Sequence, residues 1–143
     1  YGPTATLTDN RVSSIWVYNA AQGENIVMKS DGAQIRSYCY CLDCASAILK
    51  ILMKGKTAHA YNISNPNSII SIYKLAEILS KFAGMDLKSE APTLLEKKGF
   101  NLMSDSSLDS TELLGLGWKG LFDAERGLKH TIEIIKEMTV VGD

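Results

Sequence analysis

The chain has 143 residues, of which 45% are hydrophobic and 22% charged, and this composition is typical of a globular protein with a packed core. Its 15 basic and 16 acidic residues are spread along the chain and give a net charge of −1, so there is no electrostatic basis for binding nucleic acid or an anionic membrane. No apolar run in the sequence approaches the roughly 18 to 20 residues of a membrane-spanning helix. One domain is the expectation for this length.

The chain opens with Tyr1-Gly2-Pro3, and Gly-Pro is a turn signal. A turn is expected between two elements, which favours a downstream piece of a longer protein; a processed or engineered end is the alternative interpretation. The polar residues 4–11 then predict a loop. Apolar residues recur at helical spacing from Val12, so we expect a helix that ends at Gly23.

Asp9 or Asn10 is expected to cap this first helix. Residues 25–28 (NIVM) indicate a short strand, and residues 29–34 indicate a turn in which Gly32 can supply a positive φ.

The stretch 30–43 (SDGAQIRSYCYCLD) contains the best candidate for a ligand contact. A second strand is predicted from Ile35 to Cys41, and Arg36 enters it directly after the turn. A guanidinium on such a fixed base suits a bidentate grip on a phosphate. A surface ion pair with Asp31 or Asp43 explains the same spacing equally well.

Three cysteines, at positions 39, 41 and 44, form one cluster. An odd number of clustered cysteines argues against a disulfide framework and indicates a reducing compartment, which for this chain means the cytoplasm. Three thiolates at this spacing are a possible metal site, but no second Cys-x-x-Cys pair exists and His59 is distant. Packing as small apolar side chains is the favoured interpretation.

Further elements follow from caps and periodicity. Asp43 is expected to cap a helix over residues 44–54 that Gly55 ends, with an apolar side made by Ala45, Ile48, Leu49 and Leu52. A strand is predicted over residues 58–63 and a loop at Asn65-Pro66-Asn67.

The second half of the chain is mostly helical in its pattern. Ser71 is a good cap for a helix over residues 72–83, which Gly84 ends and whose stripe is Leu75, Ile78, Leu79 and Phe82. A short strand is expected over residues 87–91, and residues 93–107 leave the choice between helix and loop open. Asp109 is expected to cap a short helix over residues 110–114. The last helix is predicted over residues 123–138, with Leu128, Ile132 and Ile135 in register. The fold class is therefore mixed α/β with few, short strands.

No catalytic motif is visible in the sequence. There is no G-x-S-x-G, no H-E-x-x-H, no P-loop, and no G-x-G-x-x-G between a strand and a helix. Without a nucleophile and base pair, the residues predict binding and not a self-contained active site.

At this point several segments together match a known pattern. Residues 32–40 (GAQIRSYCY) are followed by Asp43 and a helix, by residues 60–64 (AYNIS), and by Ser71-Ile72 at the start of another helix. This order resembles the extended short-chain dehydrogenase/reductase family, the NAD-dependent nucleotide-sugar epimerases, dehydratases and decarboxylases. The opening Tyr-Gly-Pro is similar to the segment after the sixth strand of that family's dinucleotide fold.

The C-terminal segments extend the resemblance over nearly the whole chain. They are residues 108–113 (LDSTEL), residues 116–118 (LGW), residues 125–128 (ERGL) and Thr131-Ile132. The resemblance implies that residues 1–143 are a single substrate-binding domain, the C-terminal half of such an enzyme. Its helix after Asp43 and the strand near Tyr61 would complete a Rossmann sheet.

In the family, the glycine-rich NAD loop and the catalytic Tyr-x-x-x-Lys precede this region, and neither occurs in this sequence. The resemblance therefore implies that NAD serves the full-length parent, which would oxidise a UDP- or dTDP-linked sugar at C4 and then epimerise, dehydrate or decarboxylate it. The chain alone is not expected to turn over substrate. It is expected to contain no catalytic, cofactor-binding or metal-binding residue of its own.

What remains is the substrate-binding part, and the resemblance assigns it residue by residue. Arg36 matches the arginine that holds the diphosphate, and Asn67 matches a second phosphate-side contact. Residues 10–15, which include Arg11, match the segment that closes over the substrate. The strand along the nucleotide base is matched by Val27, Met28 and Lys29.

Two departures from the family pattern stand out. Members often supply a basic residue just before the Leu-Asp segment, but residues 101–105 (NLMSD) contain none, so Lys97 or Lys98 replaces it or the grip on substrate is altered. Cys41 stands where a valine is more usual, which is a packing change.

A chain that has lost its N-terminal partner domain is expected to expose apolar surface and to bury it by forming a homo-oligomer. The alternative function is a non-catalytic interaction domain derived from the same family. Which sugar, which base and which second reaction step apply is not encoded in these residues.

Overall fold

The computed structural model describes residues 1–6 and 8–140. In chain order its elements are α1 (Val12–Gln22), β1 (Ile26–Met28), β2 (Ile35–Ser37), α2 (Cys41–Lys54), the 3-10 helix η1 (Pro66–Ser68), β3 (Ile69–Ser71), α3 (Ile72–Ala83), β4 (Leu87–Ser89), α4 (Leu94–Lys98), β5 (Asp105–Ser106), α5 (Thr111–Gly115) and α6 (Ala124–Val140).

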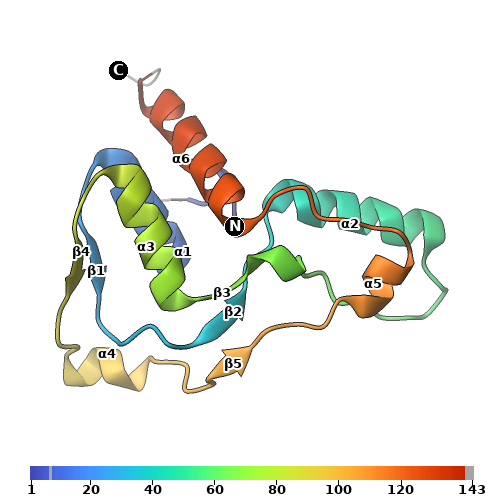
Figure 1. Ribbon diagram of the computed structural model, residues 1–143, viewed down its shortest axis with the longest axis horizontal. Helices are drawn as coiled ribbons and strands as arrows, with labels where there is room; N and C mark the ends of the chain where they lie inside the picture. The colour runs from blue at the N-terminus through green and yellow to red at the C-terminus, as the bar shows by residue number, and fades with distance from the viewer. Residues whose placement is uncertain (7, 141–143) are drawn as a thin grey trace.

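The elements form a lobe and an arm (Figure 1). In the lobe, α1, α3 and α6 pack against one another beside β1 and β4. The arm consists of α2, which extends away from the lobe, and α5, which lies beside it. The mixed α/β class predicted from the sequence is confirmed.

The strands make two small sheets. β1 pairs in parallel with β4, in the register Val27 to Lys88. β2 is the central strand of the other sheet, antiparallel to β3 and parallel to β5. Arg36 therefore sits in the middle of a three-stranded sheet, opposite Ile70 on one side and Ser106 on the other.

Helix α3 follows directly from its local sequence. The Ser71 hydroxyl accepts a hydrogen bond from the backbone N–H of Lys74, and Gly84 ends the helix in the left-handed conformation. Leu75 and Leu79 are fully buried, so the predicted stripe faces the core. The bounds of this helix agree with those predicted.

Two apolar clusters stabilise the fold, one in the lobe and one in the arm. The larger one joins α1, α3, β1 and α6, and includes Trp16, Val17, Ile26, Leu75, Leu79, Leu128, Ile132 and Ile135. The smaller one lies in the arm, where Ala47 of α2, Leu113 of α5 and Trp118 pack together. The Trp118 indole N–H donates to the Ser46 hydroxyl at 2.9 Å, which ties the two sides of the arm.

Several predicted boundaries are wrong, each for a physical reason. The strand predicted from Ile35 to Cys41 ends at Ser37, because its partner β3 begins opposite it at Ile69, and Cys41 already begins α2. Asp43 is not the cap: Tyr40 occupies that position, and the Asp43 carboxylate accepts backbone hydrogen bonds from Leu121 and Phe122 instead.

The cap of α1 also differs from the prediction. Arg11 occupies the capping position without a side-chain hydrogen bond to the helix. Asp9 still serves the helix start, since its carboxylate accepts from the Arg11 backbone N–H and the Ser14 hydroxyl. Residues 58–63 form no strand in the structure, because no other described strand lies beside them to pair with.

The open region 93–107 contains α4 and β5, and the short helix predicted to start at Ser110 starts at Thr111. None of the helices in the described part of the chain is both long and apolar enough to cross a membrane.

Candidate functional site

A cavity of about 670 Å³ opens in the lobe between α1, the ends of β1 and β2, and the α4 segment. This volume lies within the range of small-molecule sites. Sixteen residues line it: Asn10, Val12, Ile15, Trp16, Asn19, Val27, Met28, Lys29, Ser30, Gln34, Arg36, Ile72, Glu96, Gly99, Phe100 and Asn101. Apolar side chains from α1 and β1 meet a few polar groups there, which is the usual composition of a ligand pocket.

One wall is fixed by Trp16. Trp16 lies on α1 with its side chain buried in the core, and its indole N–H donates to the Val27 carbonyl at 3.2 Å. This bond holds β1 against α1, so Val27 and Met28 are presented to the cavity from a rigid base. The three residues predicted to lie along a nucleotide base, Val27, Met28 and Lys29, all line the cavity.

The turn before β2 is anchored on helix α3. The carbonyls of Gly32 and Gln34 accept the backbone N–H groups of Tyr73 and Ile72, at 2.9 and 3.0 Å. Gly32 has a φ of 67°, and a Cβ there would come within 2.7 Å of the Tyr73 backbone nitrogen. The positive φ predicted for this glycine is confirmed, and the turn admits no larger residue without strain.

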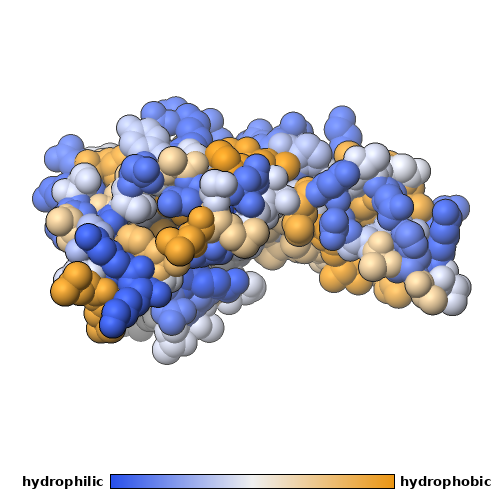
Figure 2. Space-filling model, turned by 90° about the horizontal axis from the view of Figure 1, so that it is seen from below, coloured by the Kyte–Doolittle hydropathy of each residue, from blue (hydrophilic) through white to orange (hydrophobic). Residues whose placement is uncertain are grey.

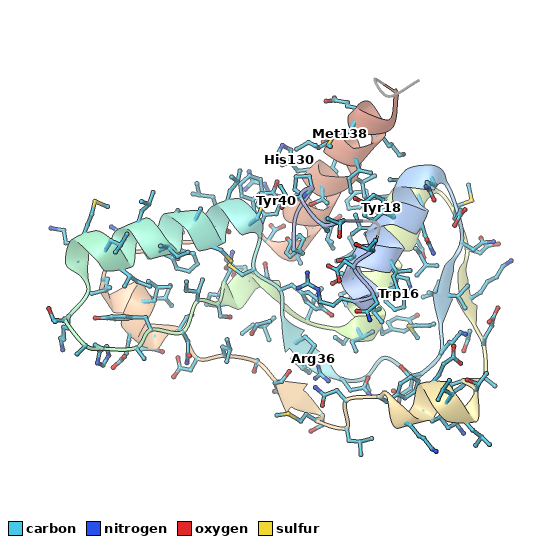
Figure 3. The ribbon with its side chains drawn as sticks, turned by 180° about the vertical axis from the view of Figure 1, so that it is seen from behind. Trp16, Tyr18, Arg36, Tyr40, His130 and Met138 are labelled. Atoms are coloured by element: carbon cyan, nitrogen blue, oxygen red, sulfur yellow. The ribbon has the colours of Figure 1, made fainter. Side chains whose placement is uncertain are left out.

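Arg36 lines the cavity from the centre of its sheet (Figure 3). One guanidinium nitrogen donates to the Ile35 carbonyl at 2.7 Å, and among the described residues it forms no ion pair. The ion pair with Asp31 or Asp43 that the spacing also allowed is not formed. Asp31 accepts from the Ala33 N–H, and Asp43 is buried elsewhere.

Lys29 is held differently from Arg36. Its ammonium lies 2.5 Å from the Glu96 carboxylate of α4, and both residues line the cavity. The Thr93 backbone N–H and hydroxyl donate to the other oxygen of Glu96, forming a capping box. Bonds from Lys29 first, and then from Thr93, lower the pKa of Glu96 to about 2.

Four side-chain amides complete the polar lining, from Asn10, Asn19, Gln34 and Asn101. The side-chain amide oxygen of Gln34 (Oε1) is buried, and no group in the described part of the chain donates to it. A buried acceptor without a donor is costly, so a ligand that donates an N–H or O–H there would relieve it.

Two predicted contacts lie outside the lining. Arg11 is exposed and pairs with Asp9, although its neighbours Asn10 and Val12 line the cavity. Asn67 is exposed in η1, where its backbone N–H donates to the Asn65 side chain. The structure therefore brings together Arg36, Val27, Met28 and Lys29, but not Arg11 or Asn67; the roles of these six residues remain predictions.

The sequence reasoning missed the α4 wall, which contributes Glu96, Gly99, Phe100 and Asn101. A signal for it exists: Thr93-x-x-Glu96 matches a capping box and predicts a helix start within the region left open. No local signal, however, predicts that Glu96 reaches Lys29, 67 residues earlier.

The three cysteines are free thiols of intermediate exposure. In the part of the chain that the structure describes, no group of three His, Cys, Asp or Glu side chains is placed to hold a metal ion.

Fold and cavity together define a mixed α/β unit with a pocket of small-molecule size, in which Arg36 is the one lining cation without an ion pair among the described residues. The family model for the NAD dependent epimerase/dehydratase family matches residues 1–64. A trifunctional UDP-glucose 4,6-dehydratase/UDP-4-keto-6-deoxy-D-glucose 3,5-epimerase/UDP-4-keto-L-rhamnose-reductase of Arabidopsis thaliana is 34% identical over 114 residues, which are 80% of this chain and 17% of that protein. UDP-glucuronic acid decarboxylase 1 of Xenopus tropicalis is 27% identical over 96% of this chain and 31% of that protein.

A solved structure has the same fold. The UDP-glucose 4-epimerase of Thermotoga maritima, crystallised with UDP-glucose, superposes with a TM-score of 0.80 at 25% identity, over 97% of this chain and 44% of that one. The chain therefore belongs to the extended short-chain dehydrogenase/reductase family of epimerases and dehydratases. It spans less than half the length of each of these three relatives.

The family is NAD-dependent, and a related dTDP-glucose 4,6-dehydratase of Bacillus anthracis was solved with NAD. The described residues do not fit this cofactor. Their parallel strand pairs, β1 with β4 and β2 with β5, are short, and no strand among them leads through a glycine-rich turn into a helix. A dinucleotide needs such a turn at a helix N-terminus.

Proposed function

We propose that this chain is the C-terminal, nucleotide-sugar-binding portion of an NAD-dependent epimerase/dehydratase. The observation that carries the proposal is the cavity of about 670 Å³, in which Arg36 forms no ion pair with any described residue and Val27, Met28 and Lys29 form one wall. A nucleotide diphosphate has an apolar base face and a negative charge, and these match the two kinds of lining group. The substrate would be a UDP- or dTDP-linked sugar.

The chain's part in the reaction is binding. Oxidation at C4 of the sugar, followed by epimerisation, dehydration or decarboxylation, is assigned to the whole protein, whose N-terminal portion would hold the cofactor and the catalytic groups. Arg11 and Asn67 are proposed to reach the sugar or its phosphates only when that portion is present, since both lie outside the cavity lining here.

The exposed face of α2 supports a missing partner domain. Five large apolar side chains on this helix are more than half exposed, namely Leu42, Ile48, Leu49, Leu52 and Met53. Apolar atoms are visible along the arm in Figure 2. An apolar face of this kind marks an interaction surface, and we propose that the N-terminal portion covers it in the whole protein.

The same face supports the second candidate function, a non-catalytic interaction or oligomerisation domain derived from the family. The two functions differ in what happens at the cavity: only the first requires nucleotide binding there. In either case we place the protein in the cytoplasm, where its three free thiols are stable.

Titration calorimetry with UDP and dTDP tests the first function. All the lining residues belong to this chain, so the nucleotide moiety can be tested on the chain itself. We expect binding that Arg36→Ala weakens by about 1.5 to 3 kcal/mol, the value of a charge-assisted hydrogen bond. Arg36→Lys should recover only part of this loss, because an ammonium lacks the bidentate fork.

The control is Arg126→Ala, which removes an arginine that lies outside the cavity, on α6. It should leave the affinity unchanged. An Arg36→Ala chain that binds within about 1 kcal/mol of the wild type would show that the charged role assigned to Arg36 is wrong. Failure of the wild-type chain to bind either nucleotide would favour the interaction domain.

A further inference from the structure

Building on the proposed function, we propose that Glu96 is a specificity-determining residue of the cavity. By pairing with Lys29 it leaves Arg36 as the one lining cation, within the described residues, that is free of an ion pair. The cavity is then built for a ligand that places its negative charge at Arg36 and an uncharged base beside the Lys29–Glu96 pair.

Both carboxylate oxygens of Glu96 have bonding partners. One lies 2.5 Å from the Lys29 ammonium, and the other accepts from the Thr93 backbone N–H and hydroxyl at 2.8 and 2.9 Å. The side chains of Lys29 and Glu96 are 38% and 36% exposed, so the pair is partly screened from water. Glu96 is therefore fixed in place as an ionised wall of the cavity.

The charges are separated along the cavity. Arg36 belongs to β2, whereas Lys29 follows β1 and Glu96 comes from α4, which lies below β1 and β4 (Figures 1 and 3). Lining residues comprise two cations and one anion, so one positive charge remains after the pairing, at Arg36. A second negative group on the base end would meet a pair with no net charge, so it would lose contact with water without gaining a cationic partner.

Two nucleotides that differ only in such a group provide the test. Orotidine 5′-monophosphate is UMP with a carboxylate on the base ring. The wild-type chain should bind it about threefold more weakly than UMP, the size expected for one partly exposed charge interaction. The affinity ratio of the two ligands is measured by titration calorimetry at pH 7.

Glu96→Gln is the main variant, because glutamine can keep the capping box while Lys29 loses its charged partner. The preference for UMP should then disappear or invert. Lys29→Met leaves Glu96 unpaired and should increase the preference by about threefold. The two variants thus move the ratio in opposite directions, which a loss of local structure would not do.

Glu77→Gln is the matched control, since Glu77 pairs with Lys74 on α3 and does not line the cavity. The ratio of this variant's affinities for UMP and orotidine 5′-monophosphate should equal that of the wild type. If UMP binds and Arg36→Ala weakens it, but Glu96→Gln and Lys29→Met leave the ratio unchanged, this inference is overturned while the proposed function stands. If UDP does not bind through Arg36, the proposed function fails and this inference fails with it; if UDP binds but UMP shows no preference over orotidine 5′-monophosphate, only this inference fails.

Discussion

Asp43 shows how one buried carboxylate joins distant parts of the chain. Only 1% of its surface is exposed, and it accepts the backbone N–H groups of Leu121 and Phe122 at 2.9 and 3.0 Å. The Asn65 amide approaches the same carboxylate and also donates to the Phe122 carbonyl. The first turn of α2 is thereby fixed to the segment that leads into α6.

Removing the Asp43 carboxylate should lower the stability of the fold. Asp43→Ala leaves the N–H groups of Leu121 and Phe122 and the Asn65 amide without this buried acceptor, and we expect the free energy of unfolding to fall by about 3 kcal/mol. Asp43→Asn keeps one acceptor oxygen and should cost about half as much. Urea denaturation followed by circular dichroism measures both values.

The control for this prediction is Asp31→Ala, because Asp31 is exposed and, within the described part of the chain, its side chain makes a local bond to the Ala33 N–H only. A change within about 0.5 kcal/mol is expected there. A similar small loss for Asp43→Ala would mean that the buried network does not stabilise the chain.

The same residue shows what the sequence could and could not predict. The sequence predicts Asp43 as a local cap, because Asp before a helical pattern is a strong signal. Its actual partners lie 78 and 79 residues away. Local signals carry no information about such a pairing, so the predicted capping role of Asp43 is wrong.

At the level of elements, prediction succeeded where caps and periodicity coincide. α3 has a serine cap, a buried stripe and a terminal glycine, and its bounds were predicted correctly. β1, β2 and β4 are three residues each, too short for a period-2 pattern to define their ends. β2 is therefore shorter than predicted, whereas the apolar side predicted for the helix after Asp43 lies on α2, where Ile48, Leu49 and Leu52 are exposed.

The start of helix α4 is stabilised by the negative charge of the Glu96 carboxylate, which is lost when the group is protonated in acid. The pKa of Glu96 is lowered from 4.5 to about 2 by its bonds to Lys29 and Thr93. A carboxylate whose folded pKa is depressed stabilises the structure above its unfolded pKa, and this contribution is lost as the pH falls through the folded pKa. The docking of α4 should therefore be constant above pH 5 and weaken between about pH 4.5 and 2.

Nuclear magnetic resonance can follow this titration at the Glu96 and Thr93 amides. A midpoint near 2 is expected in the wild type. Lys29→Met should move the midpoint toward the ordinary value of 4.5, since it removes the largest cause of the shift. A wild-type midpoint already between 4 and 5 would mean that the pair does not persist in solution.

For the whole molecule, the apolar clusters leave the outer face of α2 uncovered. Within the arm, Ala47 is buried against Leu113 and Trp118, whereas Leu49 and Leu52 are 58% and 77% exposed. No described residue covers this face. The lobe with its cavity is thus packed around its own core, while the arm presents a surface of the kind that a second body covers.

The chain alone is therefore expected to self-associate through α2. Sedimentation velocity at micromolar concentrations should show a dimer or larger species, and Leu49→Lys combined with Leu52→Lys should shift it to the monomer. Because both side chains are mostly exposed, this double variant should change the free energy of unfolding of the monomer by no more than about 0.5 kcal/mol per site. The matched control is Leu94→Lys with Leu95→Lys on α4, where the side chains are 82% and 80% exposed but lie away from α2. Association that survives the α2 substitutions and is lost with the α4 ones would place the interaction surface on α4, and it would remove the exposed arm as support for a missing N-terminal portion.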